Sequence, residues 1–460
     1  MRKHQMFIDS HAHLQFDSFD KDRESVIKRA VDNGVNYMIN IGIDIETSRQ
    51  SLEIARKHAS VFSSVGLHPY EVESFDGQAR KTMLSMLKDK NVVAVGEIGL
   101  DYYRAEVPHN VQKNIFKEQL KIAIDNDVPV IIHLRDAWDD IERVIGEVTQ
   151  NRVKGVFHCY SGNLETALRL IKKGFYISFA GNITFRNYKK IEMLREIPIE
   201  KMLIETDAPF LAPHPYRGKR NEPGYIPLIA QRLADIKGLS VEDIGRITLF
   251  NANRLFGIAP EMEEEKVVYR IRDSLYINPT VRCTADCVFC ARLINPVVKG
   301  HNLNLTEEPT IEETIEKIGD PSHYKEVVFC GYGEPTIRLD FIKKVARWLK
   351  ERGTYIRLNT NGHANLIFNR NIAPELKGLI DEISVSVNTF NEEHYEKIMR
   401  TDFNEPSFNA MFDFMKKCTQ AGIKTAATVV EIPGLDIAQC RSFVEEFGVE
   451  LRVRKYNEVG

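Results

Sequence analysis

The chain has 460 residues, of which 43% are hydrophobic and 28% are charged, and its formal net charge at pH 7 is −3. This length exceeds one ordinary domain, so two or three domains are expected. The small net charge excludes a global cationic field, and any affinity for phosphate must come from a local patch or from bound metal ions.

The ends and the cysteines indicate a cytoplasmic protein. Met1–Met6 is short and polar, and no following run has the features of a signal peptide. No segment approaches the ~18 apolar residues that a membrane span requires. Three of the seven cysteines lie within residues 283–290, which is typical of metal or cluster ligands in a reducing compartment. We therefore expect no membrane partner.

The first part of the chain alternates short β-branched runs with amphipathic segments, which is the pattern of a parallel α/β fold. The predicted strands are Phe7–His13, Tyr37–Ile41, Val61–Leu67, Val92–Ile98, Val130–Leu134, Gly155–Tyr160, Phe175–Phe179 and Met202–Asp207. Helical patterns fill the gaps, for example between Val111 and Asn126. Eight such units ending near Ile258 predict a (βα)8 TIM barrel. An open doubly wound sheet would have a glycine-rich turn after strand one, where this chain has Asp9-Ser-His-Ala-His13.

A second alternation follows an acidic break. Residues 260–266 read Pro-Glu-Met-Glu-Glu-Glu-Lys, and we expect a linker over 260–268 that divides a domain at 1–259 from one at 269–460. The six strands predicted after it are Arg270–Asn278, Val327–Cys330, Tyr355–Asn359, Ile383–Val387, Lys424–Val430 and Glu450–Lys455. Six strands predict a partial (βα)6 barrel with an open side, which favours a large substrate or a partner.

Candidate metal ligands stand at the carboxyl ends of the first set of strands, where barrel enzymes place their active sites. They are His11, His13, Glu97, His133, His158 and Asp207. In an extended strand the His-x-His spacing of His11 and His13 puts both imidazoles on one side. Imidazoles and carboxylates suit divalent ions such as zinc and manganese, and two carboxylates with Glu97 as a bridge suit a pair of ions.

The motifs that surround these residues resemble the TatD family of metal-dependent deoxyribonucleases. They are Asp9–Leu14, Gly66–Pro69, Gly96–Tyr103, His158–Gly162, Glu205–Pro209 and Pro215–Pro223, within a match from about Phe7 to Ile258. The resemblance implies an amidohydrolase-like barrel in which the six residues bind two divalent ions, with Glu97 bridging. It also implies trimming of DNA, or RNA, from the 3′ end.

Further candidates lie on the same rim. A bound metal ion gives a water nucleophile near neutral pH, and Asp207 is placed both to ligate a metal and to accept the proton of that water. His68 and Asp101 are candidates for positioning the phosphodiester, although His68 is equally compatible with a structural role before Pro69. The loop cations Arg217, Lys219 and Arg220 are candidates for binding backbone phosphates.

The second domain has the motif Cys283-Thr-Ala-Asp-Cys287-Val-Phe-Cys290. Three thiolates leave one iron of a [4Fe–4S] cluster open to an external ligand, whereas a structural zinc usually has four protein ligands. The motif resembles that of radical S-adenosylmethionine (SAM) enzymes. This resemblance implies reductive cleavage of SAM to a 5′-deoxyadenosyl radical.

Later segments fit the same resemblance. Gly331-Tyr-Gly-Glu-Pro335 stands where the family has a Gly-Gly-Glu-Pro-type turn, with Tyr332 as a departure, and Asn359–Gly362 and Ser384–Asn388 end the next two strands. The resemblance makes Gly331, Gly333, Glu334, Ser386 and Asn388 candidates for SAM contacts. The fused pair also resembles TatD-associated radical SAM proteins, which are usually encoded beside a TatD-type nuclease. This resemblance implies no substrate for the radical SAM domain.

The sequence thus predicts a bifunctional enzyme: a nuclease or phosphodiesterase using two ions (Mg, Mn or Zn), and a radical SAM domain of unknown substrate or partner. One alternative is a hydrolase of a non-nucleic-acid ester, amide or lactone, because a barrel fold does not choose the substrate. A second is a cluster domain that senses redox state and regulates the nuclease.

Overall fold

The computed structural model of the chain describes residues 6–104, 106–149, 153–259, 264–290, 297–403, 407–432, 435–446 and 448–455. The chain divides into two compact units, Met1–Met262 and Glu263–Gly460. Of the predicted linker, residues 260–263 lie outside the described part of the chain, and Val268 already belongs to a strand of the second unit.

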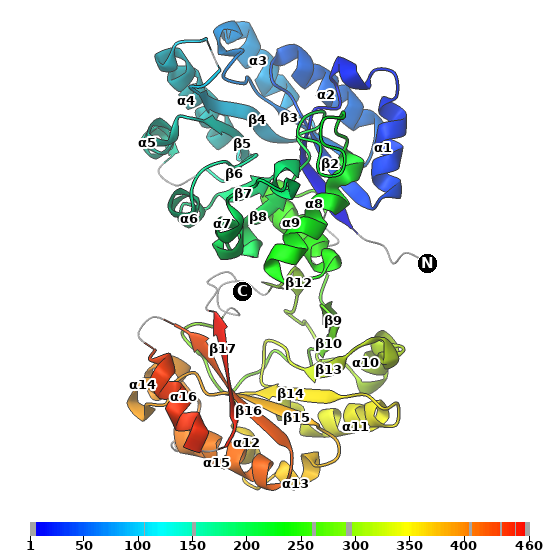
Figure 1. Cartoon of the computed structure of the whole chain (residues 1–460), viewed down its shortest axis with the longest axis vertical. Helices are drawn as coiled ribbons and strands as arrows, with labels where there is room; N and C mark the ends of the chain where they lie inside the picture. The colour runs from blue at the N-terminus through cyan, green and yellow to red at the C-terminus, as the bar shows by residue number, and fades with distance from the viewer. Residues whose placement is uncertain are drawn as a thin grey trace. The chain divides into compact units, whose positions relative to one another are not determined.

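Eight strands form one parallel sheet in the first unit, and each pairs with the next strand in the chain (Figure 1). They are β1 (Phe7–Ala12), β2 (Val35–Ile41), β3 (Val61–Val65), β4 (Val92–Asp101), β5 (Val130–Arg135), β6 (Gly155–Phe157), β7 (Tyr176–Phe179) and β8 (Met202–Ile204). Most of their side chains are buried on both faces, as strands of a parallel sheet require.

The sheet closes on itself just beyond the end of β8. The backbone N–H of Asp207 donates to the carbonyl of His11 at 2.9 Å, and the N–H of His13 donates to Ala208 at 2.8 Å. These bonds join the carboxyl ends of the first and last strands, and the predicted (βα)8 barrel is confirmed. Two residues with metal-ligand chemistry, His11 and Asp207, meet at this seam.

Helices follow the strands of the first unit. They are α1 (Arg23–Asp32), α2 (Ile45–Lys57), α3 (Gly77–Met86), α4 (His109–Asp125), α5 (Trp138–Thr149), α6 (Leu164–Lys172), α7 (Ile191–Glu196), α8 (Ile226–Lys237) and α9 (Val241–Phe256). Side-chain caps start several of them: Asp44 begins α2 and Ser240 begins α9, each with a reciprocal capping box. Short 3-10 turns η1 (Asp17–Phe19), η2 (Val72–Ser74), η3 (Gly181–Thr184), η4 (Ile199–Lys201) and η5 (Pro223–Tyr225) complete the described connections.

The sheet of the second unit has the order β17-β16-β15-β14-β13-β10-β9. Six consecutive strands run parallel, which confirms the partial barrel: β10 (Ser274–Ile277), β13 (Glu326–Phe329), β14 (Ile356–Thr360), β15 (Glu382–Ser386), β16 (Lys424–Glu431) and β17 (Glu450–Lys455). The prediction of one strand over Arg270–Asn278 was wrong, because β9 (Val268–Ile271) forms an antiparallel hairpin with β10. The chain reverses at Arg272, whose φ is +53°, beside Asp273, a residue type that favours turns.

The remaining elements of the second unit are mainly helices. They are α10 (Ile311–Ile318), α11 (Leu339–Lys350), α12 (Ala364–Phe368), α13 (Ala373–Leu376), α14 (Glu392–Met399), α15 (Ser407–Gln420) and α16 (Ile437–Glu446), with 3-10 turns η8 (Pro321–His323) and η9 (Pro335–Arg338). A separate two-stranded ribbon joins β11 (Val297–Val298) to β12 (His301–Asn302). Among the described residues, no helix is long and apolar enough to cross a membrane.

Candidate metal centre and second-unit site

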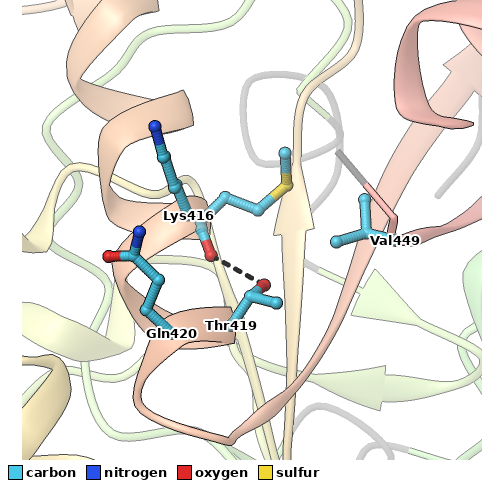
Figure 2. Close-up of a pocket in the computed structure, with 5 residues that line it drawn as sticks. Lys416, Thr419, Gln420 and Val449 are labelled. Carbon is cyan, nitrogen blue, oxygen red and sulfur yellow. Dashed lines mark hydrogen bonds between the residues drawn. The ribbon is translucent and has the colours of Figure 1, made fainter. Parts of the chain in front are cut away.

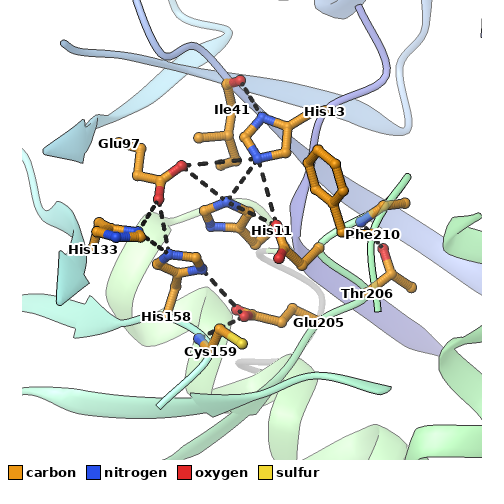
Figure 3. Close-up of polar contacts among 12 residues, drawn as sticks. His11, His13, Ile41, Glu97, His133, His158, Cys159, Glu205, Thr206 and Phe210 are labelled. Atoms are coloured by element: carbon orange, nitrogen blue, oxygen red, sulfur yellow. Dashed lines mark hydrogen bonds and ion pairs between the residues drawn. The ribbon is translucent and has the colours of Figure 1, made fainter. Parts of the chain in front are cut away.

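The six predicted ligands of the first unit lie in one cluster, in which the four histidines surround Glu97 (Figure 3). Oε1 of Glu97 lies 2.8 Å from Nε2 of His158 and 2.9 Å from Nδ1 of His133. Its other oxygen, Oε2, lies 3.4 Å from Nε2 of His11 and 3.8 Å from Nε2 of His13. The two oxygens of one carboxylate therefore face two different pairs of imidazoles.

Asp207 completes the side of the cluster that contains His11 and His13. Its Oδ1 lies 3.5 Å from Nε2 of His13 and 3.8 Å from Nε2 of His11. The side chain of Asp207 is 15% exposed, against 4% for Glu97. Asp207 is thus the more accessible carboxylate, on a backbone with φ of +55°.

The local backbone brings Glu97 and His133 together. A Cβ on Gly99 would lie only 2.0 Å from the carbonyl oxygen of His133, and Gly99 has φ of +146°. Only glycine fits this approach of β4 to β5. The pairing register also shifts between Asp9 and Ala12 in β1 and between Val95 and Ile98 in β4. His11 and Glu97 lie within these two irregular segments.

The donor set fits divalent ions. Nε2 of His11 lies 3.2 Å from Nε2 of His13, and Nδ1 of His133 lies 3.2 Å from Nε2 of His158. Paired nitrogens at this distance repel if both present lone pairs, and a cation between them removes the repulsion. Three groups of side chains have ligand atoms close enough to hold one ion: His11, His13 and Glu97; His68, Glu97 and His133; and His11, His158 and Asp207. Glu97 is common to the first two groups.

Contacts on the far side of the rings select the tautomers. Nδ1 of His13 donates to the carbonyl of Ile41 at 3.0 Å, and Nε2 of His133 donates to Oδ2 of Asp101 at 3.0 Å. Nδ1 of His158 lies 3.4 Å from Oε1 of Glu205. The two hydrogen bonds leave Nε2 of His13 and Nδ1 of His133 as lone-pair donors toward the cluster, whereas the buried Nδ1 of His158 makes no hydrogen bond among the described residues. Nδ1 of His11 is buried without a hydrogen-bond partner among the described residues.

Burial and charge act in opposite directions on Glu97. Burial alone would raise the pKa of the Glu97 carboxyl, but electrostatic interactions with the imidazoles of His158 and His68 and a hydrogen bond with His11 hold this pKa well below its usual range. Glu97 is therefore ionised, as a metal ligand must be.

His68 and Asp101, both expected to position substrate, have different places. His68 lies in the cluster, with Nε2 3.6 Å from Oε1 of Glu97, while its Nδ1 accepts the backbone N–H of Tyr70. Asp101 differs from the expectation because its oxygens are engaged by the protein: they accept from His133, the Tyr70 hydroxyl and the backbone N–H groups of Tyr103 and Arg104. Asp101 orients His133.

Sequence reasoning missed the role of Glu205. This carboxylate is 1% exposed and accepts the N–H of Cys159 at 2.7 Å while facing His158. The available signal was its position two residues before Asp207 at the end of the same strand. Asp9, also in a quoted motif, lies behind the cluster, where burial raises its pKa to about 8 while it accepts from Thr206.

The three loop cations do not form one patch. Arg217 and Lys219 are exposed, with Arg217 over the ring of Phe185 at 4.5 Å and Lys219 over Tyr216 at 5.8 Å. Arg220 instead binds both oxygens of Asp22 at 2.8 Å and the carbonyl of Ser18 at 2.6 Å. The Arg220 guanidinium therefore joins this loop to the segment after β1, contrary to its expected phosphate role.

In the second unit the three motif cysteines lie on the loop after β10, where a cluster loop was predicted. The N–H of Cys290 donates to the carbonyl of Cys287 at 2.9 Å, which forms a tight turn. Sγ of Cys287 lies 3.6 Å from Sδ of Met399, and Nδ2 of Asn361 lies 4.0 Å from Sγ of Cys283. All three cysteines are partly exposed.

The Gly-Tyr-Gly-Glu-Pro turn holds the cysteine loop directly. A Cβ on Gly333 would lie 2.1 Å from the carbonyl oxygen of Arg282, and one on Gly331 would lie 1.9 Å from Oδ1 of Asn278. The N–H groups of Gly333 and Glu334 donate to Thr280 and Arg282 at 3.0 and 2.8 Å. The N–H groups of these two candidates for SAM contacts are therefore used within the protein.

Glu334 joins this turn to the segment after β14. Its carboxylate accepts from Thr360 Oγ1 and from the N–H of Asn361, both at 2.7 Å, and also from Thr336. Glu334 is 2% exposed. Its side chain thus positions the two loops that flank Cys283.

Ser386 and Asn388 are the other two candidates for SAM contacts. Ser386 is partly exposed at the end of β15. Nδ2 of Asn388 contacts Sδ of Met399 at 3.4 Å, and Asn388 is 3% exposed with φ of +63°. Asn388 and Cys287 therefore share a contact with Met399.

The comparisons with known proteins divide the chain in the same way. Residues 8–257, more than half of the chain, match the TatD related DNase family. The chain belongs to this family. Residues 277–446 match the radical SAM superfamily, so a radical SAM domain follows the TatD domain.

Relatives of the TatD domain match it along almost their whole length. The "Uncharacterized metal-dependent hydrolase YabD" of Bacillus subtilis (strain 168) is 39% identical over 254 residues, which are 55% of this chain and 100% of that protein. The "3'-5' ssDNA/RNA exonuclease TatD" of Escherichia coli (strain K12) is 34% identical over 258 residues, covering 55% and 99%. The crystal structure of YJJV, a TatD homolog from Escherichia coli K12, has a TM-score of 0.53 and 30% identity, covering 55% and 99%.

Membership of these families implies divalent metal ions for the TatD domain, and a [4Fe–4S] cluster with SAM for the radical SAM domain. The clustered donors around Glu97 and the three thiols of the cysteine loop have the chemistry that these cofactors need.

A surface cavity of about 210 Å³ in the second unit has no such chemistry (Figure 2). It is lined by Met415, Lys416, Thr419, Gln420 and Val449, and Thr419 Oγ1 donates to the carbonyl of Met415 at 3.1 Å. This lining lacks a thiol, an imidazole and a carboxylate, so the cavity is not a candidate active site.

Proposed function

We propose that the TatD domain extends over residues 1–259 and is a two-metal phosphodiesterase that removes nucleotides from the 3′ ends of DNA or RNA. The observation that carries this proposal is the placement of Glu97 between two imidazole pairs. A carboxylate with nitrogen donors on both oxygens fits a bridge between two ions. The imidazoles suit Zn, and the carboxylates suit Mg and Mn.

We assign the ligands by the oxygen of Glu97 that they face. His11, His13 and Asp207 would hold one ion, and His133 and His158 the other, with Glu97 shared. Divalent ions in these positions supply the Lewis acid that stabilises charge on the reacting phosphate.

The chain's own residues supply the remaining steps. Asp207, the more exposed carboxylate, accepts the proton of the attacking water. His68 accepts the Tyr70 N–H on Nδ1, so its neutral ring carries a proton on Nε2 and donates it in a hydrogen bond to a phosphate oxygen. The exposed Arg217 and Lys219 bind phosphates of the substrate backbone.

The printed name of the Escherichia coli relative supports nucleic acid as the substrate class. The test is digestion of 3′-labelled single-stranded DNA by the purified chain with Mg²⁺ or Mn²⁺, beside Glu97→Gln. Metal-dependent shortening from the 3′ end that Glu97→Gln abolishes is expected. If no divalent ion supports cleavage, the substrate is instead a non-nucleic-acid ester, amide or lactone.

For the radical SAM domain, placed after a linker at residues 260–268, we propose that Cys283, Cys287 and Cys290 hold a [4Fe–4S] cluster. Such a cluster supplies the electron for cleavage of SAM, and a site open to an external ligand leaves room for SAM itself. Gly331, Gly333 and Glu334 would position SAM through the loop they hold, and Ser386 and Asn388 would face its nucleoside.

This second activity has its own assay. Anaerobic, cluster-loaded protein with dithionite should convert SAM to 5′-deoxyadenosine, and Cys287→Ala should not. Absence of 5′-deoxyadenosine from the loaded wild-type chain would favour a redox sensor that regulates the nuclease.

A further inference from the structure

Three exposed aromatic side chains border the metal centre. Tyr103 is 60% exposed, Phe210 is 52% exposed and Tyr70 is 41% exposed. Among the described residues of the first unit, these are the large aromatic side chains with high exposure. A group of exposed apolar rings beside a polar cluster indicates a binding surface, because exposed aromatic surface is unfavourable in water.

Phe210 lies beside His13 (Figure 3). Its ring centroid is 6.4 Å from that of His13 and 6.2 Å from that of Phe16, and Phe16 stacks on His13 at 4.7 Å. The backbone N–H of Phe210 donates to the backbone carbonyl of Asp207 at 2.8 Å, and the carbonyl of Phe210 accepts from Nδ2 of Asn221 at 2.6 Å. Phe210 is therefore fixed relative to Asp207, with half of its surface uncovered.

Tyr103 is linked to the other oxygen of Glu97. Its N–H donates to Asp101 at 2.9 Å, and Asp101 accepts from His133, whose Nδ1 faces Oε1 of Glu97. The guanidinium of Arg135 lies 4.2 Å from the centroid of the Tyr103 ring. Arg135 covers part of this ring and adds a positive charge, yet the tyrosine remains largely exposed.

Unpaired nucleobases match both rings. Every base has a π face that stacks on an aromatic side chain without sequence preference, and a nearby cation attracts the backbone phosphate. Bases within a duplex stack on one another, so their faces are covered. A small ester, amide or lactone without an aromatic ring would gain no stacking energy from Phe210 or Tyr103.

We propose that Phe210 and Tyr103 stack the unpaired bases on the two sides of the scissile phosphodiester. This inference rests on the proposed exonuclease function and assigns two base-stacking residues to it. Phe210 serves the nucleotide on the Asp207 side of Glu97, and Tyr103 with Arg135 serves the nucleotide on the His133 side.

The test compares kcat/KM for two oligonucleotides that differ only in their bases. One is a single-stranded thymidine oligonucleotide, and the other has abasic residues at its two 3′-terminal positions. For Phe210→Ala and Tyr103→Ala we expect a loss of roughly tenfold to 100-fold on the first and little loss on the second. Phe210→Trp should restore the rate, and Leu168→Ala, which removes an exposed side chain of α6, should match the wild type.

Equal losses on both oligonucleotides, or no loss on either, would overturn the stacking inference while leaving the nuclease intact. Absence of metal-dependent cleavage of both oligonucleotides by the wild type is a different result, because it overturns the proposed function and the stacking inference with it.

Discussion

Nδ1 of His158 lies 3.4 Å from Oε1 of the buried Glu205, while Nε2 of the same ring lies 2.8 Å from Oε1 of Glu97. The imidazole is thus held between an outer carboxylate and the cluster. Glu205 also accepts the N–H of Cys159, which fixes its orientation. A carboxylate this close to Nδ1 favours the tautomer with the proton on Nδ1, which would leave the Nε2 lone pair of His158 for a metal ion.

Glu205→Gln should weaken metal binding without removing a ligand. The amide oxygen can still accept from Cys159, but it no longer carries the charge that favours the His158 tautomer. We expect the Mn²⁺ concentration for half-maximal nuclease activity to rise by about 10-fold to 100-fold. The exposed Glu165→Gln serves as the control, and an unchanged Mn²⁺ requirement in Glu205→Gln would show that Glu205 does not act on the site.

Removal of the bridge should have a larger effect. Glu97→Gln takes a shared charge from both ion positions, so its loss of activity should exceed the upper end of the range for an outer-sphere residue, about 100-fold. The measurement is the initial rate of 3′-end digestion at saturating Mn²⁺. Activity within threefold of the wild type would be incompatible with a bridging role.

The loop cations should separate into two classes. Lys219→Ala and Arg217→Ala should weaken binding of single-stranded DNA and reduce the slope of log K against log salt by roughly 0.7 for each phosphate that the variant no longer neutralises. Arg220→Ala should lower the thermal midpoint of the TatD domain instead, because it leaves Asp22 without its two-point partner. Binding measured by fluorescence anisotropy between 50 and ~200 mM salt distinguishes them, and an Arg220→Ala protein of normal stability with a reduced slope would reverse the assignment.

In the radical SAM domain, Glu334→Gln should loosen the cysteine loop. An amide can replace the carboxylate toward Thr336 and Thr360, but its NH₂ group then faces the N–H of Asn361. A buried donor without an acceptor costs about 1–3 kcal/mol. Hydrogen exchange should therefore rise at residues 280–284 and 360–363 in the anaerobic, cluster-loaded chain. Unchanged exchange there would contradict a positioning role for Glu334.

Acid should remove a defined contribution to stability from Glu382. Burial alone would raise the pKa of this carboxyl, but Arg452 and Lys424 lower it from 4.5 to about 2. A depressed pKa stabilises the folded state fully above about 4.5, and this stabilisation is lost as the pH falls toward 2. The difference in thermal midpoint between wild type and Glu382→Gln should thus be largest at neutral pH and shrink below 4.5. A difference that is constant with pH would contradict the ion-pair origin.

Sequence patterns were informative where chemistry depends on a strand end. The barrel rule places His11, His13, Glu97, His133, His158 and Asp207 at one rim, and the structure brings them within contact of one another. Contacts between distant segments had no local signal: Asp22, the partner of Arg220, lies 198 residues away in the chain. The hairpin at Arg272 was missed because its turn has no glycine. The hydrogen bonds from the N–H groups of Gly333 and Glu334 were not foreseen because their acceptors lie on another loop.

The central claim is that Glu97 bridges two divalent ions. Anomalous diffraction at the manganese absorption edge from crystals of the Mn²⁺-loaded chain tests it most directly. We predict two manganese peaks, one beside His11, His13 and Asp207 and one beside His133 and His158, each next to a different oxygen of Glu97. A single peak, or two peaks that both lie away from Glu97, would contradict the account.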